Sequence, residues 1–117
     1  MQHTVTIKKN HEFRRLYSKG RSFAAPSLVL YARPNRQPIN RIGFTVTVKL
    51  GHAVIRNRIR RRLREIYRLH ENELKCGQDL IVVARSRAVD AAYADLERDF
   101  LYASEKLGLR EKMEGQL

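Results

Sequence analysis

Residues 53–68, AVIRNRIRRRLREIYR, contain seven arginines in sixteen positions, yet large apolar residues keep helical spacing between them. At 100° per residue the apolar positions form one stripe, and the arginines occupy the rest of the circumference. We therefore predict a long helix over about residues 53–75 whose apolar stripe packs on a sheet. The stripe consists of Ile55, Ile59, Leu63, Ile66 and His70, with Tyr67 and Leu74 at its edge.

The charges of this predicted helix are nearly all of one sign, because Glu65 is the only acidic residue between Ala53 and Arg68. Arginines four residues apart, such as Arg60 and Arg64, repel each other by about a few tenths of a kcal/mol. A helix face that is merely solvated usually mixes both signs, so solvation does not explain the pattern. A phosphate-rich partner does, since a guanidinium group binds phosphate through two parallel hydrogen bonds.

The composition supports this interpretation, because 24 Lys and Arg against 12 Asp and Glu give a formal net charge of +12 over 117 residues. Such a surplus indicates a polyanionic partner, and nucleic acid is the first to consider. RNA is favoured over DNA, since no zipper heptads and no second short helix adjoin the arginine helix.

Aromatic residues near the N-terminus stand among basic ones, as they do in proteins that stack single-stranded RNA bases. The aromatic residues are Phe13, Tyr17, Phe23 and Tyr31, beside Lys8, Lys9, Arg14, Arg15, Lys19 and Arg21. The alternative for Phe13 and Tyr17, which have helical spacing, is a place in the hydrophobic core.

The length predicts a single domain with one modest core. We expect one RNA-binding domain over residues 1–117, ordered over about 5–108, with a frayed tail at about 109–117. The lone Cys76 excludes an internal disulfide framework and is expected to be a buried or half-buried thiol. No apolar run approaches the length of a membrane span, and the cytoplasm is the expected location.

The remaining elements follow from turn residues and periodicity. Asn10 can cap a first helix that Gly20 ends, and Asp90 can cap a last helix that ends at Gly108. Extended segments are predicted at residues 21–26, 27–32, 41–48 and 80–84, with a hairpin loop at 33–40. The order predicts an α+β sandwich of helices over a small mixed sheet, with a parallel crossover that is right-handed by the general rule.

Three stretches of the chain resemble the protein subunit of bacterial ribonuclease P. They are KKNHEFRRLYSKG at residues 8–20, RIGFTVTVKLGHAVIRNRIRRRLRE at 41–65 and DLIVVAR at 79–85. Their order and spacing match over about residues 5–107. The most specific part is Arg56-Asn57-Arg58, which follows a strand and continues into further basic residues at helical spacing.

The resemblance implies a two-layer αβββαβα domain of the ribosomal protein S5 domain 2-like fold, with a left-handed βαβ crossover in place of the right-handed one. It also implies a non-catalytic subunit of a ribonucleoprotein endoribonuclease. Such a subunit binds the catalytic RNA and precursor tRNA and assists hydrolytic removal of the 5′ leader. Any Mg²⁺ would be held by the RNA, and neither a membrane nor a small-molecule substrate would be involved.

The resemblance also implies two sets of site residues. Those on the arginine helix would bind the catalytic RNA and are Arg56, Asn57, Arg58, Arg60, Arg61, Arg64 and Arg68. A cleft between the first helix and the sheet would hold the single-stranded leader. Its residues would be Phe13 and Tyr17, with Tyr31 at the floor and Lys9, Arg14, Arg21 and Lys49 supplying charge.

Two alternatives stay open at this stage. A general structural RNA-binding protein of ribosomal type would use the same charge. A metal-dependent nuclease would need carboxylates such as Asp95 and Asp99, which are four residues apart on the last predicted helix. The charges around that pair are mixed, so we expect a solvated face, no catalytic residue in the polypeptide and no metal held by it. The four histidines show no ligand spacing.

Overall fold

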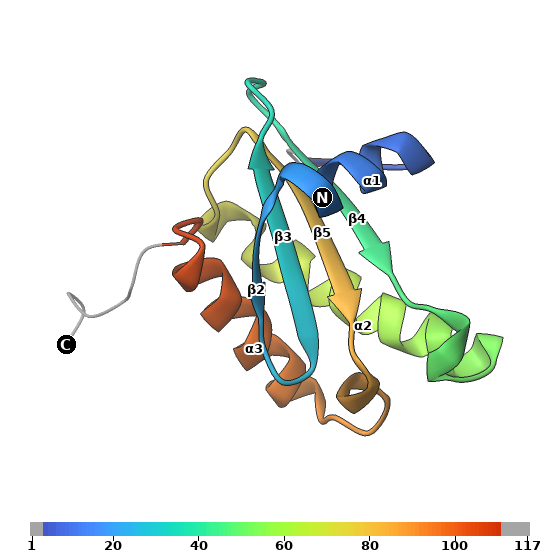
Figure 1. The fold of residues 1–117 in the computed structure, drawn as a ribbon. Coiled ribbons are helices and arrows are strands. Elements are labelled where there is room, and N and C mark those ends of the chain that lie inside the picture. The colour runs from blue at the N-terminus through green and yellow to red at the C-terminus, as the bar shows by residue number, and fades with distance from the viewer. Residues whose placement is uncertain (1–3, 111–117) are drawn as a thin grey trace, which may run out of the picture.

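The apolar run that follows the arginine helix forms β5 (Gln78–Ala84), the central strand of a five-stranded sheet (Figure 1). Leu80 and Val82 belong to the main core on one face of the sheet, and Ile81 belongs to a second buried cluster on the other face. Successive side chains of a strand point to opposite faces. The prediction of an α+β fold with a strand covered on both faces is therefore confirmed.

The structure is a computed structural model that describes residues 4–110. The other strands and the helices are β1 (Thr4–Thr6), α1 (Asn10–Lys19), β2 (Arg21–Ala24), β3 (Leu28–Pro34), β4 (Asn40–Thr45), α2 (Ala53–His70) and α3 (Tyr93–Lys106). Short 3-10 helices lie at Val48–Leu50, Glu71–Glu73 and Ser86–Val89. Strand β1 was not predicted from the sequence, since its three residues are too few for a periodic pattern.

The strand order is β1-β4-β5-β3-β2, with β4 parallel to β1 and β5, and β3 antiparallel to β5 and β2. Residues 35–39 therefore connect two strands that have β5 between them, and the predicted hairpin at 33–40 is wrong. The reason is that β5 is apolar on both faces and takes the middle of the sheet, which separates β3 from β4.

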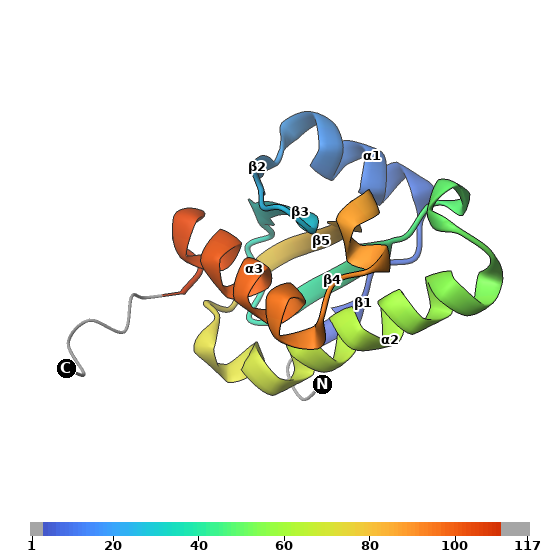
Figure 2. The ribbon, with the colours of Figure 1, turned by 90° about the horizontal axis from the view of Figure 1, so that it is seen from below.

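The helices lie on both faces of the sheet, with α1 on one face and α2 and α3 on the other (Figure 2). Helix α2 connects the adjacent parallel strands β4 and β5. In Figure 1 both strands run downward with β4 on the right, and α2 passes behind the sheet, so this crossover is left-handed. The hand matches the one implied by the family resemblance and departs from the general rule.

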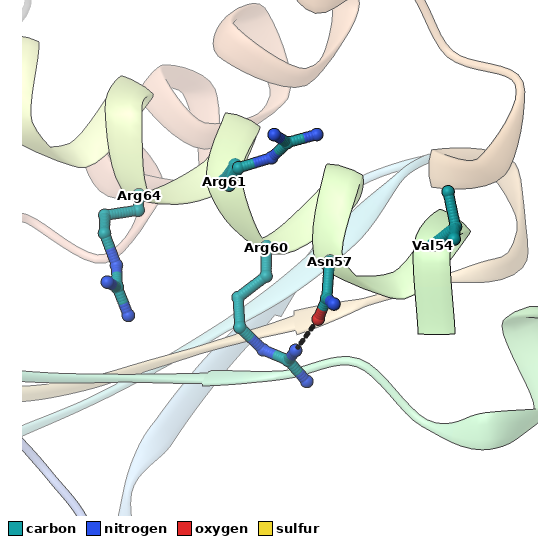
Figure 3. A pocket seen from close by; sticks show the side chains of 5 residues that line it. All are labelled: Val54, Asn57, Arg60, Arg61 and Arg64. Carbon is teal, nitrogen blue, oxygen red and sulfur yellow. Dashed lines mark hydrogen bonds between the residues drawn. The ribbon is translucent and has the colours of Figure 1, made fainter. Parts of the chain in front are cut away.

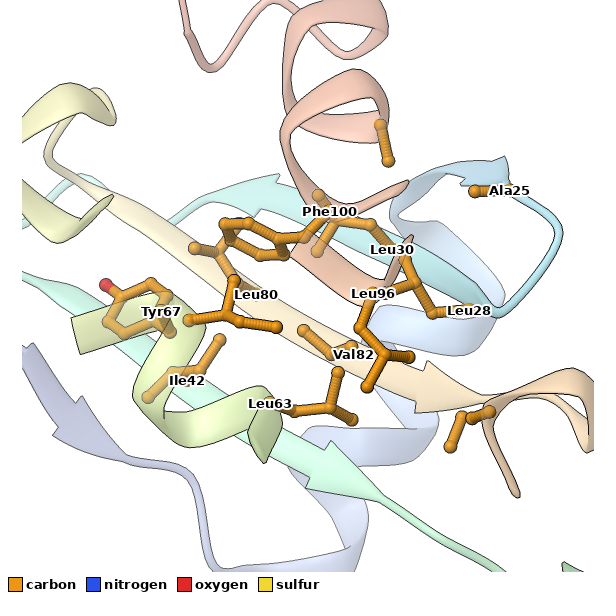
Figure 4. Close-up of a cluster of buried hydrophobic side chains, with 14 of the residues drawn as sticks. Ala25, Leu28, Leu30, Ile42, Leu63, Tyr67, Leu80, Val82, Leu96 and Phe100 are labelled. Atoms are coloured by element: carbon orange, nitrogen blue, oxygen red, sulfur yellow. The ribbon is translucent and has the colours of Figure 1, made fainter. Parts of the chain in front are cut away.

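The apolar stripe of α2 is buried as predicted at Ile59, Leu63, Ile66 and Tyr67. These side chains meet residues of the sheet and of α3, including Ile42, Leu80 and Phe100 (Figure 4). The rings of Tyr67 and Phe100 make an edge contact with centroids 6.3 Å apart. Removal from water of apolar surface on this scale is the main force that holds α2 on the sheet.

Several element ends differ from the predictions. Helix α2 ends at His70 and not near residue 75, because a separate 3-10 turn follows it. Strand β4 ends at Thr45, and Val48 is 74% exposed in the next 3-10 turn. Asn10 and Asp90 are not N-caps: those positions are Lys9 and Ala92, and neither makes a side-chain capping bond.

The C-terminal end is packed further than expected. Leu109 is 2% exposed, and its carbonyl accepts a hydrogen bond from the Lys75 backbone. Arg110 pairs with Glu73 and Glu105. The prediction of a frayed tail is therefore wrong for residues 109 and 110. Residues 111–117 of the predicted tail lie outside the described part of the chain. Between residues 4 and 110 no helix is both long and apolar enough to cross a membrane.

Candidate nucleic-acid interface

The outward side of α2 forms a shallow hollow of about 480 Å³ at the N-terminal half of the helix (Figure 3). Its lining residues are Val54, Asn57, Arg60, Arg61 and Arg64. They recur at helical spacing because the apolar stripe of α2 points to the core and turns the remaining positions outward. The Asn57 side-chain oxygen accepts a hydrogen bond from Arg60 Nη1 at 3.0 Å, which orients this guanidinium.

The arginines of α2 have three different surroundings. Arg56 donates to the Gly51 carbonyl and Arg62 to the Ala91 carbonyl, so both also tie α2 to neighbouring segments. Arg68 pairs with Glu65, and this hydrogen bond lowers the pKa of the Glu65 carboxyl. Of the seven arginines, Arg68 alone has an ion-pair partner among residues 4–110.

Four residues of the predicted set therefore present charge that the described chain does not neutralise. They are Arg58, Arg60, Arg61 and Arg64. All four project from one helix, and Figure 3 shows that Arg61 points away from Arg60 and Arg64, so α2 presents positive charge over a broad surface. Phosphate groups at hydrogen-bonding distance would neutralise this charge.

Phe13 and Tyr17 of α1 and Tyr31 of β3 form an aromatic row on the opposite face of the sheet. The Phe13 and Tyr17 ring centroids are 6.4 Å apart, and Tyr17 meets Tyr31 edge-on at 5.0 Å. The residue of α1 that fills the core beneath is Leu16, which is 1% exposed, whereas Tyr17 is 40% exposed. The structure thus places Tyr17 at the surface and Phe13 in a half-buried position.

A hollow of about 500 Å³ opens beside this row, between α1 and the end of β4. It is lined by Asn10, Phe13, Arg14, Tyr17, Phe44, Thr45, Val46 and Arg60. We call this hollow the aromatic cleft. Arg60 lines both the aromatic cleft and the hollow on α2, so the two surfaces meet at its side chain.

The Phe13 ring lies directly on the backbone of Gly43 in β4. A Cβ atom at residue 43 would stand 2.7 Å from Phe13 Cζ, closer than real Cβ contacts. Gly43 is therefore required for this ring position. The sequence signal was a glycine inside the extended segment predicted at 41–48, since glycine within a strand commonly marks a close backbone approach.

Other predicted cleft residues lie elsewhere. Arg21 donates to the Leu107 carbonyl at 2.8 Å, on the side of the sheet that α3 covers. Lys9 caps α1 and Lys49 lies in the 3-10 turn after β4; both are exposed, and neither lines the aromatic cleft. Tyr31, predicted at the cleft floor, contacts the Tyr17 ring but is not among the lining residues of the cleft. Phe23, considered above only as an aromatic residue among basic ones, packs edge-on against Tyr102 of α3.

The contribution of β4 to the aromatic cleft was not predicted from the sequence. Thr45 Oγ1 lies 2.7 Å from the Tyr17 hydroxyl, and the Arg64 guanidinium lies over the Phe44 ring, 5.9 Å from its centroid. Phe44 is partly buried and also packs against the main core. Its place at the cleft depends on how α1 crosses the sheet, which the sequence does not specify.

The carboxylates of α3 have structural surroundings. Asp99 is 4% exposed and accepts hydrogen bonds from the Ser27 backbone at 3.0 Å and from its hydroxyl at 2.6 Å. The expected solvated face is therefore wrong for Asp99, while Asp95 forms a surface pair with Arg98. The described residues bring no three His, Cys, Asp or Glu side chains together as a metal site.

Cys76 is exposed, contrary to expectation, because it lies in the turn before β5.

Comparisons with known proteins agree on one family. The family model for ribonuclease P matches residues 1–108. The ribonuclease P protein component of Natranaerobius thermophilus is 43% identical over 112 residues, 96% of this chain and 97% of the relative. The component of Alkaliphilus metalliredigens is 39% identical over 93% of this chain and 98% of the relative.

Solved structures show the same fold. The ribonuclease P protein of Staphylococcus aureus superposes with a TM-score of 0.83 at 34% identity, over 91% of this chain and 97% of that one. The ribonuclease P protein of Thermotoga maritima superposes with a TM-score of 0.77 at 24% identity, over 83% and 92% of the two chains.

Proposed function

Because this chain belongs to the ribonuclease P protein family, we propose that it joins a catalytic RNA and assists cleavage of the 5′ leader from precursor tRNA. Its relatives are protein components of this endoribonuclease. The family assignment favours this role over a ribosomal packaging role. With precursor tRNA as the substrate, the proposed location is the cytoplasm.

The outward side of α2 is the proposed contact for the catalytic RNA. Arg58, Arg60, Arg61 and Arg64 would each meet phosphate groups, and Asn57 would hold Arg60 in position. Arg56 and Arg68 would add less, since one is bonded to a backbone carbonyl and the other to a carboxylate. The exposed Val54 lies in the same hollow and adds apolar surface for riboses.

The aromatic cleft is the proposed site for the single-stranded leader. Its exposed Tyr17 ring offers a stacking surface for a base, and Phe13 and Tyr31 support that ring from two sides. Arg14 would bind a phosphate of the leader at the rim. Stacking on an aromatic side chain contributes about 1–3 kcal/mol per base and tolerates any base, which suits a variable leader.

We place the active site and its Mg²⁺ ions on the RNA. Several acidic side chains between residues 4 and 110 are engaged in other contacts: Asp79 with Arg41, Asp99 with Ser27, and Glu73 with His70 and Arg110. Bound Mg²⁺ would supply the activated water and charge stabilisation that phosphodiester cleavage needs. The protein would contribute substrate affinity and screening between two folded RNAs.

The observation that supports this proposal most directly is the set of unpaired guanidinium groups on α2 in a chain of this family. Reconstitution with the catalytic RNA tests it. Cleavage of precursor tRNA at limiting Mg²⁺ should rise strongly when the protein is added, and protein without RNA should cleave nothing. No gain from the protein would refute the proposal.

A further inference from the structure

A second basic pocket, of about 450 Å³, lies on the flank of α1 that faces away from the aromatic cleft. It is formed by α1, the ends of β3, β4 and β5, and the loop between β3 and β4. Four arginines line it: Arg15, Arg33, Arg36 and Arg41. We call it the loop pocket. Nothing in the proposed contacts of α2 or of the aromatic cleft uses these four side chains.

The charges of the loop pocket are only partly balanced. Arg41 forms ion pairs with Glu12 of α1 and with Asp79 of β5, the latter at 3.7 Å. Asp79 also accepts a hydrogen bond from Asn35 at 3.0 Å. Arg15, Arg33 and Arg36 have no carboxylate partner within the described residues. The one carboxylate that lines the loop pocket, Asp79, is engaged by Arg41 and Asn35, so the pocket keeps a surplus of positive charge.

The loop that presents Arg36 is held in one conformation. Asn35 donates from its side chain to the Ile39 carbonyl and accepts from the Gln37 backbone at 2.8 Å. The Asn35 backbone in turn donates to the Gly77 carbonyl at 2.8 Å. Arg36 itself has φ of 60°, the one non-glycine residue with positive φ between residues 4 and 110.

A positive φ is costly for a residue with a Cβ, and glycine or asparagine would adopt it more easily. Residues in strained backbone conformations cluster at functional sites, where the surrounding contacts enforce them. Here the contacts of Asn35 enforce it, and the result is that the Arg36 side chain borders the loop pocket. An anion that binds there would meet a loop that needs no reordering.

We propose that the loop pocket is a phosphodiester-binding site for RNA, separate from both α2 and the aromatic cleft. Arg33 and Arg36 would bind one phosphate group between them, and Arg15 would bind it or its neighbour. The inference extends the proposed function, since it adds a third contact with RNA. In Figure 1 the loop between β3 and β4 lies at the end of the sheet away from the start of α2.

The test removes charge from the pocket without disturbing the loop. The double variant Arg33→Gln/Arg36→Asn eliminates two guanidinium groups, and asparagine tolerates the positive φ at residue 36. Its thermal stability should equal or exceed that of the natural protein. Lys106→Gln is the charge control on α3, on the opposite face of the sheet, where the lysine lies over the Tyr102 ring.

Binding is measured as a function of salt concentration in two arms. The first arm measures binding of the protein to the catalytic RNA alone. The second measures binding of the holoenzyme to precursor tRNA that bears a long leader, with mature tRNA as the comparison. The double variant should bind about tenfold more weakly in one arm, which identifies the source of the phosphate. In that arm the slope of log binding constant against log salt concentration should fall by about 0.7–0.9 per lost contact. Lys106→Gln should leave this slope unchanged. Unchanged slopes in both arms would overturn the site.

A third readout separates this inference from the proposed function. Titration of the free protein with a short oligouridylate should shift the amide resonances of Gln37 and Gly77 in the natural protein and not in the double variant. If these shifts appear while the protein fails to stimulate cleavage, the phosphate site stands and the proposed function falls. If the protein stimulates cleavage but its amide shifts and salt slopes equal those of the double variant, the phosphate site is refuted and the proposed function stands.

Discussion

The hydroxyl oxygen of Tyr17 lies 2.7 Å from Thr45 Oγ1, so a single hydrogen bond joins the exposed side of α1 to the end of β4. Both residues line the aromatic cleft. The hydrogen bond fixes the Tyr17 ring, although the residue is 40% exposed. A ring held in this way loses little side-chain entropy when a base stacks on it.

Substitution at Tyr17 separates the ring from its hydroxyl. Tyr17→Phe keeps the stacking surface and should weaken binding of leader-bearing tRNA by about 0.5–1.5 kcal/mol at most. Tyr17→Ala removes the ring and should cost about 1–3 kcal/mol. Affinity of the reconstituted holoenzyme for precursor and mature tRNA measures both. If the substitutions weaken the binding of mature tRNA equally, Tyr17 does not contact the leader.

Gly43→Ala tests whether the position of the Phe13 ring matters. The added methyl group would stand 2.7 Å from Phe13 Cζ, so the ring must shift from its present position. Such overpacking typically costs about 1–3 kcal/mol of stability. We expect weaker leader binding and unchanged affinity for the catalytic RNA, both measured by titration. Leader affinity equal to that of the natural protein would show that the ring position is irrelevant.

Arg60→Ala/Arg64→Ala should flatten the salt dependence of binding to the catalytic RNA by about 0.7–0.9 per lost phosphate contact. Arg68→Ala is the matched control, because Glu65 already neutralises this arginine within the chain. The control should change the slope by much less. A slope that the double variant leaves intact would show that this side of α2 does not touch RNA.

Asp99→Ala distinguishes a structural from a catalytic carboxylate. It leaves the buried backbone N–H and hydroxyl of Ser27 without an acceptor, which should lower the free energy of unfolding by about 1–3 kcal/mol. Asp95→Ala removes only a surface pair and should cost about 0–1 kcal/mol. Both folded variants should support full cleavage in the holoenzyme. Cleavage lost from folded Asp99→Ala would instead indicate chemistry at this residue.

His70 gives the stability a predictable pH dependence. Burial opposes its protonation, but hydrogen bonds to Glu97 at 2.8 Å and to Glu73 outweigh burial and raise the pKa of His70. The pKa of Glu73 is lowered, since its bonds to His70 and Arg110 outweigh the opposing effect of burial.

A raised pKa in the folded state means that the His70 contribution is complete below its ordinary pKa of about 6.5 and is lost as pH rises through the folded value. The Glu73 contribution is present above its ordinary pKa and lost as pH falls through its own folded value. His70→Gln should therefore cost about 0.5–1 kcal/mol near pH 5.5 and less near pH 9. Denaturation at both pH values measures this, and a pH-independent cost would contradict it.

Much of the fold could be predicted because its elements have strong periodic signals. The stripe of α2 and the apolar run of β5 specified a helix on a sheet without tertiary information. The hand of the crossover and the separation of β3 from β4 could not be obtained that way, since they depend on which strand occupies the middle of the sheet. The family resemblance supplied the hand, and only the structure supplied the strand order.

The candidate site was predictable to a different degree for its two surfaces. The arginines of α2 are identified by charge alone, although charge does not reveal that Glu65 neutralises Arg68. The aromatic cleft depends on how α1 crosses β4, so Phe44 and Thr45 were missed and Arg21 was misplaced. A side chain on an edge strand such as β2 can point to either face, and its neighbours in sequence do not specify which.

The central claim is that α2 and the aromatic cleft contact different RNAs. Site-specific photocrosslinking tests it, in a Cys76→Ser background that removes the exposed natural thiol. Probes on Val54→Cys, at the α2 hollow, and Asn10→Cys, at the cleft, would be compared in the reconstituted holoenzyme with precursor tRNA. We predict crosslinks from residue 54 to the catalytic RNA and from residue 10 to the leader. Crosslinks from both positions to the same RNA, or from residue 10 to mature tRNA alone, would contradict the account.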